Sequence, residues 1–180
     1  MPTSIEKIVD GFPFPTIDPI VGTPDDESII DIHLKLNSNT TSVQSNIGCG
    51  MLGLLFLTVL LAVYATLSTI VFVPPVNPGP EPNIHTGTTG AAIADLWYHH
   101  SEATKIFTEY KNTNKALHHH MLASTDELYV QYLRHKYISY RKTTTRSLLD
   151  NLYATFANIS ASALQENATR LQARLAHALP

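Results

Sequence analysis

A long stretch without charge most strongly limits what this sequence can fold into. No Asp, Glu, Lys or Arg occurs between Lys35 and Glu81, and residues 51–73 inside this gap read MLGLLFLTVLLAVYATLSTIVFV. The mean hydropathy of this apolar run is roughly 2.4, which is in the range of membrane spans. As one helix it would extend about 34 Å, enough to cross a hydrocarbon core of about 30 Å. Side chains this apolar must be covered by lipid or by other protein.

The apolar run has two interpretations. It is either a single-pass membrane helix or the central helix of an all-α domain, apolar on every side because neighbouring helices cover it. Both interpretations predict one continuous, very hydrophobic helix over residues 51–73. The side chains that would face lipid or the core are Met51, Leu54, Leu55, Leu57, Leu60, Leu61, Val63, Leu67 and Val71.

Prolines divide the chain into four predicted parts. Residues 1–22 contain four of the eleven prolines and are predicted to form an extended Pro-rich arm. Residues 23–73 are predicted to be a helical pair that includes the apolar run. Residues 74–90 begin with five prolines in ten positions, which no helix survives, and form a Pro/Gly linker. Residues 91–180 are predicted to be a C-terminal helical region.

The first helix of the predicted pair has a recognisable start. Thr23 is a suitable N-cap and Pro24 suits the first helical position, so we expect a helix over residues 24–45. Apolar residues also alternate over residues 30–36, which would suit a strand and leaves that alternative open.

Apolar residues recur at helical spacing throughout the C-terminal region. One stripe runs over residues 93–110, and the polar triplet 112–114 is predicted to end that helix. Further helices are predicted over 117–133, with a bend at residues 124–126, after Thr145, and over 164–175. The predicted fold class is therefore all-α, a helical bundle joined by short turns.

The rest of the sequence argues against catalysis and metal binding. A single cysteine, Cys49, excludes a disulfide framework and a Cys-rich zinc site. The histidine runs 99–100 and 118–120 lack the i,i+3 or i,i+4 spacing that places two ligands on one helix face. Neither a P-loop nor a GxSxG nucleophile motif is present. We therefore predict no enzyme, no cofactor and no metal site.

One basic cluster is a candidate binding surface, although the net charge of −3 argues against a basic module as a whole. Cations interleaved with tyrosines are typical of surfaces that bind single-stranded RNA. The alternative is a solvated segment between helices whose tyrosines pack inward. The residues of this cluster are Arg134, Lys136, Tyr137, Tyr140, Arg141, Lys142 and Arg146.

Five phrases of the sequence, taken in order, resemble the Gag-like N-terminal region of copia-type LTR retrotransposon polyproteins. They are HLKLNSNTTSVQSNIGCGMLGLLFLT (33–58), AVYATLS (62–68), FVPPVNPGPEP (72–82), ATKIFTEYKNTNKAL (103–117) and LLDNLYATFANISASALQEN (148–167). The resemblance extends over nearly the whole chain and includes no catalytic signature.

This resemblance implies a capsid-like helical subunit that self-associates and packages RNA in cytoplasmic virus-like particles, without enzymatic activity. Members of the family continue further, so the resemblance also implies a truncated copy. The alternative, if the apolar run spans a bilayer, is a single-pass membrane protein with a small helical domain.

The apolar run departs from the family pattern at two places. Members of the family tend to read Thr-Val-Ser-Pro before AVYATLS and to have a proline before FVPP, whereas this chain has Leu60-Leu61 and Val71. A proline at the first place would divide the run into two short helices, and its loss is expected to fuse them into one. The resemblance favours an origin of the run in core helices.

Overall fold

The chain is mostly helical wherever its structure is described. The computed structural model describes residues 4–45 and 52–157, of which 59% are helical, and no strand occurs in these two ranges. The predicted all-α class is therefore confirmed. The strand alternative for residues 30–36 is wrong, because these residues lie inside a helix.

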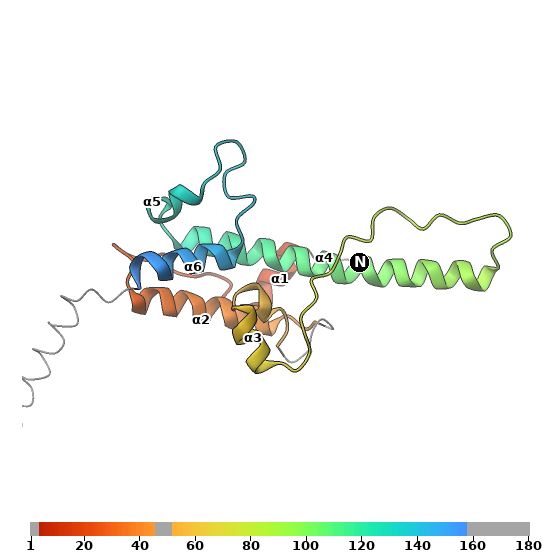
Figure 1. The fold of residues 1–180 in the computed structure, drawn as a ribbon, viewed down its shortest axis with the longest axis horizontal. Coiled ribbons are helices and arrows are strands. Elements are labelled where there is room, and N and C mark those ends of the chain that lie inside the picture. The colour runs from red at the N-terminus through yellow and green to blue at the C-terminus, as the bar shows by residue number, and fades with distance from the viewer. Residues whose placement is uncertain (1–3, 46–51, 158–180) are drawn as a thin grey trace, which may run out of the picture.

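Three helices from distant parts of the sequence pack around one core. Figure 1 shows α6 (Thr145–Phe156) between α2 (Asp26–Ser42) and the C-terminal half of α4 (Gly90–Ser124). One face of each helix carries apolar side chains at helical spacing, and these faces meet. The buried side chains are Ile29, Ile32, Leu36, Leu117, Met121, Leu148, Leu149 and Leu152.

Helices α2 and α6 each begin at a capping box, in which two residues satisfy each other's backbone N–H groups. The Asp25 carboxylate accepts from the Ser28 N–H (2.9 Å), and the Ser28 hydroxyl accepts from the Asp25 N–H (3.0 Å). Thr144 and Ser147 do the same for α6. The helix predicted after Thr145 is observed as α6, which begins at Thr145 itself. The predicted cap of the first helix at Thr23 is wrong, because Asp25 caps it two residues later.

The first 22 residues are not an extended arm throughout. They include α1 (Ile5–Asp10), which packs against α4. The amide of Asn39, on α2, also holds the following segment: it accepts from the N–H of Phe14 (2.9 Å) and donates to its carbonyl (2.8 Å). The prediction failed because prolines do not prevent a segment from contributing apolar side chains to the core. The buried side chains in question are Ile8, Phe12 and Ile17.

The apolar run is not one helix, which corrects the prediction for residues 51–73. It contains a short 3-10 helix, η1 (Leu55–Leu57), and the seven-residue helix α3 (Leu61–Leu67), and residues 68–73 are not helical. The expected fusion into one helix is therefore also wrong. No helix in the described part of the chain combines the length and the apolar character needed to cross a membrane.

The few small or polar residues of the apolar run account for these breaks. Gly53 has a φ of +50°, which is outside the right-handed helical region. The Thr58 hydroxyl lies 2.6 Å from the Asn37 side-chain oxygen on α2, just after η1 ends. The Ser68 hydroxyl accepts from the Ile70 N–H (3.1 Å), so a local turn replaces the next helical hydrogen bond.

Burial divides the predicted residues of the apolar run into two sets, although Tyr64 and Phe72, in the later part of the run, are also buried. Leu54, Leu55 and Leu57 are buried in the core. The core interpretation is wrong for the second set, which is exposed: Leu60, Leu61, Val63, Leu67 and Val71. The remaining member of the predicted set, Met51, lies outside the described residues.

Helix α4 is longer than predicted. It continues through residues 112–114, because Thr113 faces the core and is buried, and it ends at Ser124. A separate helix over 117–133 is therefore wrong, because residues 117–124 continue α4. The bend predicted at residues 124–126 falls where α4 ends, and the short α5 (Glu127–Val130) and η2 (Gln131–Leu133) follow. In Figure 1 the N-terminal half of α4 projects beyond the other helices, and residues 74–89 arch beside it without forming a helix. The predicted helix over 164–175 lies outside the described residues.

Candidate nucleic-acid interface

The predicted basic cluster lies mainly on the loop that joins η2 to α6, residues 134–143, called here the basic loop. Figure 1 shows this loop rising away from the bundle beside α5. Its tip closes by two backbone hydrogen bonds between His135 and Ser139, of 3.1 and 3.0 Å. Ser139 has a φ of +52°, a left-handed conformation that lets the chain turn back toward α4.

The tip of the basic loop exposes a cation and an aromatic ring together. Tyr137 is 80% exposed, and the Lys136 ammonium lies 5.3 Å from the centre of its ring. Arg134, at the base of the loop, forms an ion pair with Glu127 on α5 (2.8 Å). Because both partners of that pair are exposed, solvent and salt weaken it and leave the guanidinium accessible.

Tyr140 has a different role from Tyr137. Its side chain is only 9% exposed and belongs to the hydrophobic core, so it anchors the second half of the loop to the bundle. Burial, together with the negative charge of Glu127, raises the pKa of Tyr140. The alternative in which tyrosines pack inward therefore describes Tyr140 but not Tyr137, and Tyr140 offers no exposed ring on which a base could stack.

Arg141 and Lys142 follow the anchor and are both exposed. In the described part of the chain neither of them has an ion-pair partner. Together with Lys136, they place three cations on the surface of one short loop. The segment that contains Arg141 and Lys142 is held in place by Tyr140 before it and by the α6 capping box after it.

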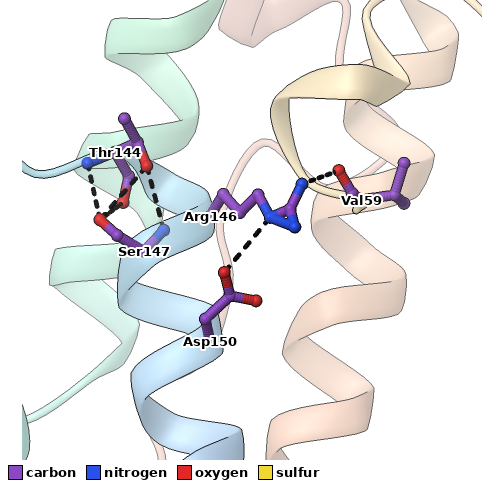
Figure 2. A network of polar contacts seen from close by, with 5 residues as sticks. All are labelled: Val59, Thr144, Arg146, Ser147 and Asp150. Atoms are coloured by element: carbon purple, nitrogen blue, oxygen red, sulfur yellow. Dashed lines mark hydrogen bonds and ion pairs between the residues drawn. The ribbon is translucent and has the colours of Figure 1, made fainter. Parts of the chain in front are cut away.

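Arg146 does not belong to this surface, although the sequence places it in the cluster. Figure 2 shows its guanidinium bonded to the carbonyl oxygen of Val59 and to Asp150 (3.3 Å). Its side chain is only 20% exposed. Arg146 therefore connects α6 to the apolar run, and its Nε and one terminal nitrogen are used within the fold.

A groove beside the basic loop brings in residues that the sequence analysis did not identify. It has a volume of about 380 Å³ and lies between α4 and residues 139–143. Lys115 and His118, on α4, face Ser139, Arg141 and Thr143 across it. No sequence signal could have identified Lys115, because it is a single lysine on a helix and lies 26 positions before Arg141 in the chain.

His118 and Thr143 form the hydrogen-bonded wall of the groove. The Thr143 hydroxyl donates to the Tyr140 carbonyl (2.7 Å), and it has only one hydrogen. Its oxygen therefore accepts from Nε2 of His118 (3.1 Å), which places the proton of the neutral imidazole on Nε2. Burial and the neighbouring His119 lower the pKa of His118, so this ring is neutral at pH 7.

These features suit the binding of an extended anion. Within the described residues, no three His, Cys, Asp or Glu side chains come close enough together to hold a metal ion. What the loop and groove supply instead is cations, hydroxyl groups and one exposed ring.

No family model, no curated protein and no solved structure matches this chain.

Proposed function

We propose that this chain is a structural subunit that binds RNA and self-associates, a capsid-like protein of the Gag type that the sequence resembles. The observation that carries this proposal is the basic loop: Lys136, Arg141 and Lys142 are exposed on the same loop as the exposed Tyr137 ring, and Tyr140 anchors that loop in the core.

The basic loop has the two components that sequence-tolerant RNA binding uses. Lysine and arginine side chains neutralise backbone phosphates and release counterions, which provides most of the affinity. An exposed aromatic ring accepts a base of any identity by stacking. The paired capping-box and core contacts on either side of the loop fix its base, so little order has to be gained on binding.

The exposed part of the apolar run supports self-association. Large aliphatic side chains at this density are rarely left exposed on a protein that remains a monomer. A second copy of the chain is the partner that the Gag-like resemblance implies. The exposed side chains of the run are Leu60, Leu61, Val63, Leu67, Ile70, Val71 and Val73. Together with the exposed Val76 that follows them, they are called here the apolar surface.

The RNA part of the proposal is tested with the double substitution Arg141→Ala/Lys142→Ala. Binding of labelled single-stranded RNA is measured by fluorescence anisotropy over a series of salt concentrations. Loss of two phosphate contacts is expected to reduce the slope of log K against log salt by about 1.4, since each contact contributes about 0.7. The matched control is Lys105→Ala/Lys111→Ala, which removes the same charge from α4 and is expected to leave the slope unchanged.

An unchanged affinity and slope in the loop variant would exclude the basic loop as the RNA site. Assembly is tested separately by sedimentation of the full chain in a density gradient. The expected result is a dense particle that nuclease treatment disrupts. A monomer that sediments slowly and does not bind RNA would contradict the proposal.

A further inference from the structure

The groove between α4 and residues 139–143 extends the basic loop into a defined pocket. Lys115 enters it from α4 and Arg141 from the loop, so two cations that are distant in sequence line one cavity of about 380 Å³. We propose that this groove is a phosphate subsite, which holds one phosphate of single-stranded RNA between Lys115 and Arg141. The inference rests on the proposed function and adds to it a site and a further residue.

The charges of the groove favour an anion. None of the described residues that line it is acidic. Lys115 and Arg141 are both exposed, and neither makes an ion pair within the described part of the chain. Two unpaired cations at one cavity repel each other, and a phosphate between them removes that repulsion while it gains charge-assisted hydrogen bonds.

The walls of the groove are fixed before any ligand arrives. The chain of hydrogen bonds from His118 to Thr143 to the Tyr140 carbonyl joins α4 to the loop. The left-handed backbone of Ser139 aims the returning strand at α4, and Tyr140 secures it in the core. A ligand therefore meets a preformed site, which lowers the entropy cost of binding.

The size of the groove agrees with a small ligand unit. A volume of about 380 Å³ is at the lower end of the range for ligand pockets, so it suits a single nucleotide unit better than a larger cofactor. The groove is continuous with the exposed cations of the basic loop through Arg141. A strand whose phosphate sits here can thus continue over Lys142 and the loop.

The substitution Lys115→Gln tests this site, with Lys111→Gln as the matched control one turn earlier on α4. Binding of a labelled ten-residue oligouridylate to the full chain is measured over a series of salt concentrations. We expect Lys115→Gln to weaken binding about threefold to tenfold and to reduce the salt slope by about 0.7, and Lys111→Gln to change neither.

A second measurement uses the unsubstituted protein and does not depend on how a variant folds. Lysines are acylated with an amine-reactive reagent, and the extent of modification at Lys115 and Lys111 is compared by mass spectrometry. The probes are oligouridylate, uridine monophosphate and inorganic phosphate, each added separately. Oligouridylate is expected to protect Lys115 and not Lys111.

The outcomes separate this inference from the proposed function. If RNA binds through Arg141 and Lys142 but Lys115 is neither required nor protected, the groove is overturned and the proposed function stands. If oligouridylate does not bind while uridine monophosphate or inorganic phosphate protects Lys115, the phosphate subsite stands and its RNA source is wrong. If no probe protects Lys115, the subsite is overturned.

Discussion

Gly53 lies where the apolar run crosses the C-terminal end of α2. The Leu54 N–H donates to the Thr40 carbonyl across this crossing (3.1 Å). A Cβ at position 53 would lie 2.6 Å from the Thr40 oxygen and 2.7 Å from the Val43 oxygen, and the φ of +50° already disfavours a side chain. Both the backbone conformation and the close approach therefore require glycine.

We expect Gly53→Ala to lower the free energy of unfolding by about 3 kcal/mol, from left-handed strain together with the clash against α2. The control is Gly22→Ala, where φ is +81° but no described atom lies within 4 Å of an added Cβ, so only the strain of about 1 kcal/mol applies. Urea unfolding of both variants measures the difference. An equal decrease in the free energy of unfolding in both variants would show that residue 53 is not in close contact with α2.

At the scale of elements, the start of α3 explains how an apolar run becomes two short helices. Leu60 is the N-cap, with an extended backbone (φ −63°, ψ 142°), and Leu61 is the first helical residue. Proline is favoured at a first helical position and requires an extended residue before it. The Ser-Pro that the family resemblance places here would therefore match this backbone.

Leu61→Pro is accordingly expected to leave the free energy of unfolding unchanged or to raise it by up to about 1 kcal/mol. Ala65→Pro, in the same helix and equally exposed to solvent, removes an internal hydrogen bond and is expected to cost about 3 kcal/mol. Thermal or urea unfolding distinguishes the two. If Leu61→Pro lowered the free energy of unfolding as much as Ala65→Pro, residue 61 would lie inside a helix and not at its first position.

For the molecule as a whole, the apolar surface is a stretch of large aliphatic side chains that the fold leaves exposed. Val71 is 74% exposed and lies within it, and Val21 is 96% exposed but lies outside it. If the apolar surface joins copies of the chain, Val71→Asp should weaken self-association about tenfold, because burying a valine side chain contributes about 1.5 kcal/mol or more.

The measurement is sedimentation velocity of nuclease-treated protein over a range of concentrations, and Val21→Asp is the matched control. Both substitutions should leave the fold intact, since neither side chain is buried. A self-association constant that is the same for both variants would mean that copies meet through another surface.

Much of the fold follows from local sequence. The leucines at 148, 149 and 152 predict the helix that is observed as α6, because helical periodicity depends on neighbours within a few residues. The basic loop is also visible in sequence, since its cations lie close together along the chain. The role of Lys115 cannot be seen in the sequence, because Lys115 comes near Arg141 only through the packing of α4 against the loop.

The sequence by itself determined the helical class, the presence of a helix after Thr145 and the concentration of positive charge over residues 134–142. Only the tertiary structure decided the fate of the apolar run, the burial of the N-terminal segment and the use of Arg146. The physical reason is that hydropathy reports how apolar a segment is and not what covers it. Gly53, Thr58 and Ser68 form contacts and turns in three dimensions, and these break a run that a hydropathy window treats as continuous.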